Sequence, residues 1–336
     1  MRRHRKRFNP VIKVLLLVLC AAVIGAVAFL AVRADREAES VQVENAGEAL
    51  HGVEKQTELL RGDESAALKK HTETVLLLGI DRDGGMPVYE KRVPFYNYNQ
   101  ADVIVLLCID NDAKTVVPLQ INRDTMMEVP WLDVLGNYGG TEFEQICLAY
   151  NSGSGLNDSC KNTVDTVRSL LFDAPVDHYL AFSMGGINTL NDLVGGVTVT
   201  ITDDLTPVDP TLTKGSTVTL HGEQAENFIR ARMALAEDTN TARMRRHRDY
   251  FQGFMTSARK AFNSDSEFML KAVEKLQSYM VTDLTAEAMS TLVSRLDTYD
   301  IGQILYADGE LQLGEYYEFY VDEDDLWRIV KEALCT

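Results

Sequence analysis

The residues with the clearest chemical potential in this sequence are arginines concentrated in one short stretch. Six arginines and one histidine lie within residues 230–248, which contain no lysine: Arg230, Arg232, Arg243, Arg245, Arg246, His247 and Arg248. A guanidinium presents a planar fork of N–H donors that matches phosphate oxygens. In an extended segment or at a helix end, Arg230 and Arg232 can point to one face, and on a helix Arg243 and Arg246 share one. Such a fork could hold a diphosphate; the alternatives are a solvated helix or a stripe on anionic lipid headgroups.

Two aspartates lie at the ends of predicted strands. The apolar run Thr74–Ile80 is followed by Asp81, and Asp102 begins the next apolar run, Val103–Ile109. Open α/β sheets bind ligands at such strand ends. Two neighbouring carboxylates could share a hard cation such as Mg²⁺, which prefers oxygen ligands. The alternative is that each aspartate only caps or solvates its strand.

A third cluster, Arg123-Asp124-Thr125, follows the apolar run Thr115–Ile121. An arginine at a strand end offers phosphate a second fork. The alternative is a surface ion pair between Arg123 and Asp124, which contributes little to stability.

The elements that must position these residues alternate between strands and helices. Further strands are predicted at His178–Phe182, Val197–Ile201, Gln303–Tyr306 and Tyr316–Val321. Helices are predicted at Ser159–Phe172, Met184–Val194, His221–Met233, Thr241–Phe262, Ser266–Met280, Thr285–Leu296 and Glu323–Leu334. This alternation predicts an α/β sandwich with a mixed sheet.

The N-terminus carries a membrane signal. Residues 1–10 contain the basic cluster Arg2–Arg7, and the 22 residues Val11–Val32 hold only one charge, on Lys13. A helix of that length spans about 33 Å, enough to cross a bilayer core. The positive-inside rule places residues 1–10 in the cytoplasm and the rest outside. We therefore expect a single-pass protein of the cell membrane with an extracellular C-terminal domain; a cleaved signal peptide is the alternative, but its apolar region is normally shorter.

The charge of the remainder excludes some partners. Residues 1–36 hold eight of the 33 Lys and Arg and one of the 50 Asp and Glu, which leaves 25 basic and 49 acidic residues in 37–336. Residues 37–336 are so acidic that they repel nucleic acid, except where basic side chains are concentrated. We expect no nucleic-acid partner. Of the five cysteines, Cys147 and Cys160 could pair, although sequence cannot show their geometry.

Six segments occur in an order typical of a known family: Thr74–Asp81 (TVLLLGID), Ala101–Leu107 (ADVIVLL), Gln120–Thr125 (QINRDT), Val176–Val199, Gly222–Arg232 (GEQAENFIRAR) and Asn240–Tyr250 (NTARMRRHRDY). On these motifs, the chain resembles the LytR-CpsA-Psr family of cell-envelope phosphotransferases from about Thr74 to Phe262. The resemblance implies a three-layer α/β/α sandwich behind one N-terminal transmembrane helix. It also implies the following organisation: a cytoplasmic segment (1–10), an anchor (11–32), a partly helical stalk (33–72), a catalytic domain (73–262) and a C-terminal extension packed on or beside it (263–336).

The resemblance also implies a function. Such proteins take a glycopolymer, of the teichoic acid or capsular polysaccharide type, from a polyprenyl-pyrophosphate carrier. They transfer it to a peptidoglycan hydroxyl in Gram-positive bacteria, and an apolar cleft takes the prenyl tail. The expected partners are thus the lipid-linked glycan, peptidoglycan and the membrane. The alternatives are a pyrophosphatase acting on the same carrier, a non-catalytic envelope regulator or binding protein, and a purely structural anchor protein.

Site roles follow residue by residue. Asp81 and Asp102 resemble the Mg²⁺-associated carboxylates, and Arg123 resembles the pyrophosphate-holding arginine, with Asp124 as its structural or catalytic partner. The remaining matches are to pyrophosphate-binding arginines: Arg230, Arg232, Arg243 and Arg246. The family's aspartate before the last pair is Asn240 here, and nearby Asp238 could substitute for it. Asp81 or Asp124 could accept the proton of the acceptor hydroxyl.

Overall fold

A mixed β-sheet forms the centre of the molecule. The computed structural model describes residues 56–87, 97–133, 137–231, 240–265, 268–285, 288, 291–292, 295, 298–314 and 316–336. The sheet has the strand order β11-β8-β3-β4-β5-β12. Its strands are β3 (Thr72–Ile80), β4 (Ala101–Asp110), β5 (Thr115–Ile121), β8 (His178–Ser183), β11 (Met280–Thr282) and β12 (Asp300–Ile301). Neighbours β3, β4 and β5 are antiparallel, whereas β8 runs parallel to β3 and β12 parallel to β5, so the predicted mixed sheet is confirmed.

The apolar runs become strands because they are covered on both faces. Leu76 and Leu106 pack in one core cluster, and Val75 and Leu107 in another on the opposite face. The β4–β5 connection is the tight turn that its composition predicts. Asp110 Oδ1 accepts hydrogen bonds from two backbone amides of the turn, and Lys114 adopts a φ of 53°.

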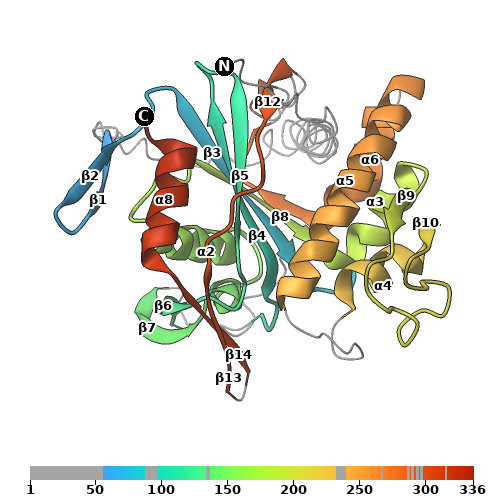
Figure 1. The fold of residues 1–336 in the computed structure, drawn as a ribbon, viewed down its shortest axis with the longest axis horizontal. Coiled ribbons are helices and arrows are strands. Elements are labelled where there is room, and N and C mark those ends of the chain that lie inside the picture. The colour runs from blue at the N-terminus through green and yellow to red at the C-terminus, as the bar shows by residue number, and fades with distance from the viewer. Residues whose placement is uncertain are drawn as a thin grey trace, which may run out of the picture.

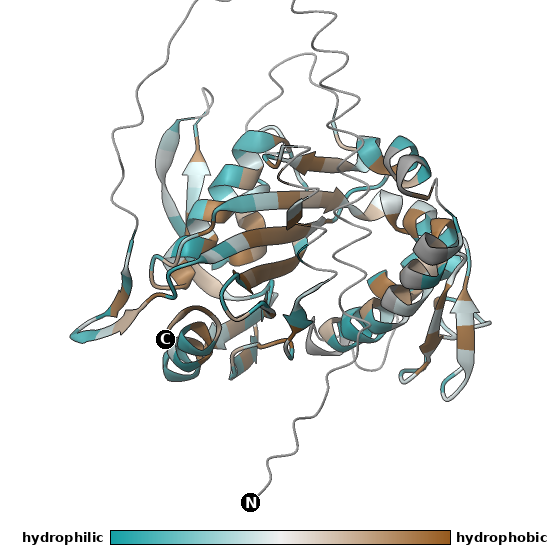
Figure 2. Ribbon diagram, turned by 90° about the horizontal axis from the view of Figure 1, so that it is seen from above, coloured by the Kyte–Doolittle hydropathy of each residue, from teal (hydrophilic) through white to brown (hydrophobic). Residues whose placement is uncertain are grey.

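Helices cover the two faces of the sheet, which gives the predicted α/β/α arrangement (Figure 1). On one face lie α2 (Asn157–Leu170) and α8 (Glu323–Leu334), with the 3-10 turn Ile146–Tyr150. On the other lie α3 (Ile187–Leu193), α4 (Glu223–Arg230), α5 (Asn240–Ser264) and α6 (Phe268–Leu276). Viewed from above, the central strands are largely hydrophobic along their length (Figure 2). They therefore supply the shared wall of both core clusters.

Four hairpins surround this core: β1 (Glu58–Arg61) with β2 (Glu64–Ala67), β6 (Met126–Leu132) with β7 (Tyr138–Gln145), β9 (Val197–Thr200) with β10 (Thr217–Leu220), and β13 (Gly309–Leu313) with β14 (Tyr317–Val321). The first corrects the expectation of a partly helical stalk over residues 56–67. That segment is a hairpin because Leu59 is buried in the core beside α8.

The described part of the C-terminal tail completes the central fold. β11 and β12 form the two edges of the sheet, and α8 has the bounds predicted for it. The predicted strand Gln303–Tyr306 is reduced to a single bridge between Leu305 and Leu119. Most of the predicted helix Thr285–Leu296 lies outside the described residues. The expected boundary at residue 262 falls inside α5, so helix and sheet both continue across it.

The predicted membrane anchor, Val11–Val32, also lies outside the described residues. Within the part of the chain that the structure describes, no helix combines the length and the hydropathy that crossing a membrane requires. Cys147 and Cys160 are both buried as free thiols and do not form the disulfide that the sequence left open.

Candidate functional site

The polar site lies at one edge of the central sheet because four strand ends meet there. β3 ends at Ile80, which pairs with Ala101 at the start of antiparallel β4 and with Ser183 at the end of parallel β8. The end of β5 reaches the same edge, since Ile121 pairs with Ile104. This topology brings Asp81, Asp102 and Arg123 together, as the strand-end positions predicted.

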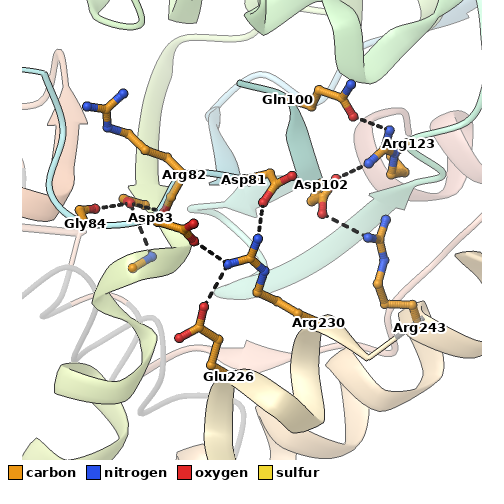
Figure 3. Close-up of polar contacts among 12 residues, drawn as sticks. Asp81, Arg82, Asp83, Gly84, Gln100, Asp102, Arg123, Glu226, Arg230 and Arg243 are labelled. Carbon is orange, nitrogen blue, oxygen red and sulfur yellow. Dashed lines mark hydrogen bonds and ion pairs between the residues drawn. The ribbon is translucent and has the colours of Figure 1, made fainter. Parts of the chain in front are cut away.

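Asp102 is the centre of a buried ion-pair network (Figure 3). Its Oδ1 accepts a hydrogen bond from Arg123 Nη1, and its Oδ2 lies 2.9 Å from Arg243 Nη1. All three side chains are at most 8% exposed. Asp102 thus fixes two guanidinium groups side by side, and guanidinium N–H donors are the groups that match phosphate oxygens.

The position of Arg123 is determined by further neighbours. Its Nη2 donates to Gln100 Oε1 at 2.5 Å, and its Nε lies 3.2 Å from Asp124 Oδ1. Burial alone would lower the pKa of the Arg123 guanidinium, but the acidic groups nearby, Cys147, Asp102 and Asp124, raise it. Arg123 therefore stays a fixed cation.

Asp124 is fully buried behind Arg123. Its Oδ1 accepts a hydrogen bond from Gln145 Nε2 at 3.4 Å, and its carbonyl oxygen accepts one from Phe319 N at 2.8 Å. Asp124 thus ties β7 and β14 to the end of β5. These contacts favour the structural role that the sequence allowed for Asp124, because a general base must reach the substrate.

Arg230 connects the other predicted carboxylate to α4. Its Nη2 lies 2.7 Å from Asp81 Oδ1, and its Nη1 lies 2.6 Å from Asp83 Oδ1 and 2.7 Å from Glu226 Oε1 (Figure 3). Glu226 and Arg230 are four residues apart on a helix, the spacing that places them on one face. Three residues of the network were not predicted from the sequence: Gln100, Asp83 and Glu226. Of these, Glu226 was detectable from its spacing to Arg230.

Of the carboxyl groups predicted for the site, Asp81, Asp102 and Asp124, that of Asp81 is the most accessible, with 40% of its side chain exposed. Burial raises its pKa and the charge of Asp102 raises it further, while Arg230 and Arg123 lower it, so that the net shift is upward. A carboxylate with a raised pKa in a cleft is the kind of group that accepts a proton in catalysis.

Arg246 does not join this network, in contrast to the role predicted for it. Its side chain is 1% exposed and is held by Asp203 Oδ2 at 2.8 Å and by the carbonyl oxygens of Phe228 and Ala231. The guanidinium thus satisfies carbonyls at the end of α4, a structural task that sequence spacing alone could not separate from ligand binding. Arg232 and Asp238 lie outside the described residues, and Asn240 is the first residue of α5.

An apolar cavity begins beside the polar edge. It encloses about 1040 Å³ of space, part of it open to solvent, between the sheet and helices α3 and α5. Its floor includes Gly79 and Val103, which lie next to the strand ends that carry Asp81 and Asp102. Phe251 and Phe254 of α5 line it, and its few polar residues are Gln120, His247 and Arg248.

His247 is a neutral member of this wall. Its Nε2 lies 3.2 Å from the carbonyl oxygen of Ile229, to which it donates a hydrogen bond. Burial, together with the nearby charge of Arg243, lowers the pKa of His247 to about 3. The imidazole therefore adds no charge to the apolar cavity at neutral pH.

Comparison with known proteins identifies the fold and the family. The LytR_cpsA_psr family matches residues 37–333. The chain therefore belongs to the LytR_cpsA_psr family. One relative of this LytR_cpsA_psr protein is the polyisoprenyl-teichoic acid–peptidoglycan teichoic acid transferase TagU of Bacillus licheniformis. It is 28% identical over 267 residues, which make up 77% of this chain and 76% of TagU.

Two solved structures share the fold of this chain. The Lin1025 protein from Listeria innocua aligns with a TM-score of 0.51 and 27% identity, covering 79% of this chain and 99% of that one. A structure of TagT bound to LIIa-WTA aligns with a TM-score of 0.55 and 21% identity, covering 84% and 96%. The second similarity is one of fold alone.

Proposed function

We propose that this LytR_cpsA_psr protein is a membrane-anchored extracellular phosphotransferase. It moves a glycopolymer of the teichoic acid or capsular type from a polyprenyl-pyrophosphate carrier to a hydroxyl of peptidoglycan. The observation that carries the proposal is the buried Asp102–Arg123–Arg243 network, whose Asp102 directly precedes the cavity-lining residue Val103. Two guanidinium groups beside an apolar cavity suit a diphosphate joined to a long hydrocarbon chain.

The relatives support the transferase class. TagU of Bacillus licheniformis is named for transfer of teichoic acid from a polyisoprenyl carrier to peptidoglycan, and its similarity to this chain spans most of both proteins. A related TagU occurs in Enterococcus faecalis, 27% identical over 78% of this chain and 79% of that protein. The identity of the polymer that this chain transfers is part of what we propose.

The arginines have separate tasks in this reaction. Arg123 and Arg243 hold the pyrophosphate oxygens, and their fixed positions stabilise the charge that builds up as phosphorus passes through its transition state. Arg230 lies on the Asp81 side and orients that carboxylate. Arg232, which precedes the undescribed segment, is a further candidate for the pyrophosphate.

The acceptor oxygen attacks the phosphorus that carries the glycan, and the bond from this phosphorus to the bridging oxygen breaks. Polyprenyl monophosphate leaves, and the acceptor proton passes to a carboxylate. Asp81 suits this task because its side chain is 40% exposed, whereas Asp124 is fully buried.

The donor set fits Mg²⁺. The charge of Asp102 raises the pKa of Asp81, so a cation between the two carboxylates would relieve their repulsion. The described residues contain no cluster of three or more His, Cys, Asp or Glu side chains arranged to hold a metal. Mg²⁺ needs only one or two carboxylates, because water and phosphate oxygens fill the rest of its shell. Such an ion would neutralise charge on the pyrophosphate.

The proposed location follows from the N-terminus. The apolar segment Val11–Val32 anchors the chain, the basic residues before it stay in the cytoplasm, and the catalytic domain faces the cell wall. A lipid-linked donor in the same membrane is then accessible to the apolar cavity.

The test uses the full chain in detergent with a polyprenyl-pyrophosphate glycan and peptidoglycan. We expect release of polyprenyl monophosphate that needs Mg²⁺, stops with EDTA, and leaves the glycan on peptidoglycan. Arg123→Ala should lower the rate by about 100-fold or more, by analogy with the loss of an oxyanion donor. Arg328→Ala, which removes a side chain 59% exposed on α8, is the matched control and should keep the rate.

Two other results would redirect the assignment. Release of the monophosphate without glycan on peptidoglycan would indicate the pyrophosphatase. Binding of the carrier without any release would indicate the regulator or binding protein.

A further inference from the structure

A second cleft lies next to the polar site and differs from the apolar cavity in its chemistry. It encloses about 810 Å³, part of it open to solvent, between the end of β5, helix α5 and the segment that leads into β13 and β14. Its wall combines aromatic with amide and charged side chains: Phe319, Tyr306, Gln120, Asn122, Arg248 and Asp308. The apolar cavity, in contrast, is lined almost entirely by hydrocarbon.

The lining of the cleft includes chain neighbours of the arginines at the polar edge. Asn122 immediately precedes Arg123, and Met244, which also lines the cleft, immediately follows Arg243. On the far wall, the amide of Phe319 donates a hydrogen bond of 2.8 Å to the carbonyl oxygen of Asp124. A ligand in this cleft therefore lies beside the residues that hold the pyrophosphate.

Two residues, Gln120 and Arg248, line both cavities and so form the partition between them. Arg248 Nη1 donates to Gln120 Oε1 at 3.2 Å, and the guanidinium carbon lies 5.3 Å from the centre of the Tyr306 ring. The ring is still 49% exposed. About half of Tyr306 is thus accessible to a ligand, and the Arg248 guanidinium lies over its ring.

These features match a saccharide. A sugar presents apolar C–H groups beside hydroxyls, and a half-exposed tyrosine offers it an apolar ring with a polar tip. Amide and charged side chains around the ring provide the few directed hydrogen bonds by which pockets orient a polar ligand.

We infer that this cleft binds the acceptor saccharide, with Tyr306 as its stacking platform and Arg248 as the partition from the donor lipid. The inference rests on the proposed function, because it takes the apolar cavity for the lipid of the donor. The second substrate must then approach the same phosphorus from another direction, and the polar cleft lies on the other side of the Arg248–Gln120 contact. The glycan of the donor has the same chemistry as the acceptor, so the two sources need separate tests.

The experiment measures binding to the full chain in detergent by calorimetry, without any turnover. The probes are a soluble peptidoglycan disaccharide and a lipid-free teichoic acid fragment. We expect the disaccharide to bind, Tyr306→Ala to weaken it at least tenfold, and Tyr306→Phe to retain it. Tyr138→Ala is the matched control, since Tyr138 is 69% exposed on β7 and does not line the cleft.

Several outcomes would overturn the inference. They are the absence of disaccharide binding to the wild type, equal loss in Tyr138→Ala, or Tyr306-dependent binding of the teichoic acid fragment alone. The result is separable from the proposed function. Transfer that proceeds with an unchanged acceptor KM in Tyr306→Ala would remove the cleft from the mechanism and leave the transferase. Tyr306-dependent binding in a protein that transfers nothing would keep the saccharide cleft and remove the proposed transferase activity.

Discussion

At the scale of single residues, the charges around Asp81 make a pH-dependent prediction. Burial and Asp102 raise the pKa of Asp81, and a protonated carboxylate cannot accept a proton. Activity should therefore fall as the pH is lowered through a midpoint set by the pKa of Asp81. The measurement is the pH profile of kcat/KM for carrier release.

Two variants should move this midpoint in opposite directions. Asp102→Asn removes a negative neighbour, so the pKa of Asp81 and the midpoint should fall. Arg230→Gln removes a positive neighbour and should raise both. Shifts of the same sign in the two variants would contradict the assignment of Asp81 as the proton acceptor.

Sequence reasoning located the reacting groups better than it separated their tasks. Asp81, Asp102 and Arg123 were predicted from strand ends, and the structure brings them together because antiparallel neighbours place those ends at one edge. Arg243 and Arg246 looked equivalent because their spacing puts both on one helix face. Only the residues packed around α5 distinguish them, since Arg243 contacts Asp102 and Arg246 contacts the end of α4.

At the scale of elements, we expect substitutions of two arginines of α5, Arg243 and Arg246, to have different effects. Arg246→Ala leaves Asp203 and the carbonyls at the end of α4 with fewer partners, so the free energy of unfolding should fall by about 3–5 kcal/mol. Arg243→Ala should mainly weaken binding of a pyrophosphate. Denaturant unfolding and inorganic pyrophosphate binding, measured on both variants, separate the two effects; a larger binding defect in Arg246→Ala would restore that residue to the site.

The floor of the apolar cavity makes a second prediction at this scale. A Cβ atom on Gly79 would lie 2.9 Å from Val103 Cβ and 3.3 Å from Met184 Cε, so Gly79→Ala should push these side chains into the cavity. We expect a higher KM for a long-chain prenyl donor and little change for a short-chain one, with an overpacking cost of about 1–3 kcal/mol.

Gly302→Ala is the control for this variant, because the nearest atom to an added Cβ there is 3.5 Å away. An equal rise in KM for long and short donors would place the lipid elsewhere.

The element bounds show where local pattern was sufficient. β5 and α8 have the predicted bounds because their apolar periodicity and turn or cap residues agree; Asp322, for example, caps α8 by accepting from two backbone amides. The hairpin β1–β2 was not predicted, since its four-residue strands depend on distant partners. Leu59 packs in the core and Glu64 accepts a hydrogen bond from Trp327 Nε1 at 2.7 Å.

At the scale of the whole molecule, the two ends of the described domain support each other. Leu68 forms a bridge with Cys335, and the amide of Lys69 donates to the carbonyl oxygen of Leu334 at 3.0 Å. Removal of residues 323–336 should expose the core that contains Leu59 and Leu76, and the truncated chain should lose its cooperative thermal transition.

Calorimetry of the truncated chain tests this prediction. The full chain with Arg328→Ala, which changes one exposed residue of α8, provides the comparison. A cooperative transition within a few degrees of the wild type would show that α8 is dispensable to the fold.

The position of β12 and α8 at the end of the sequence has a consequence for the order of events during synthesis. A ribosome delivers the chain from its N-terminus, so β3, β4 and β5 emerge more than a hundred residues before β12 and α8. Until then the outer edge of β5 has no partner and one sheet face lacks α8. The domain must remain unfinished, and exposed to misassembly with other chains, until residues 323–336 have been made.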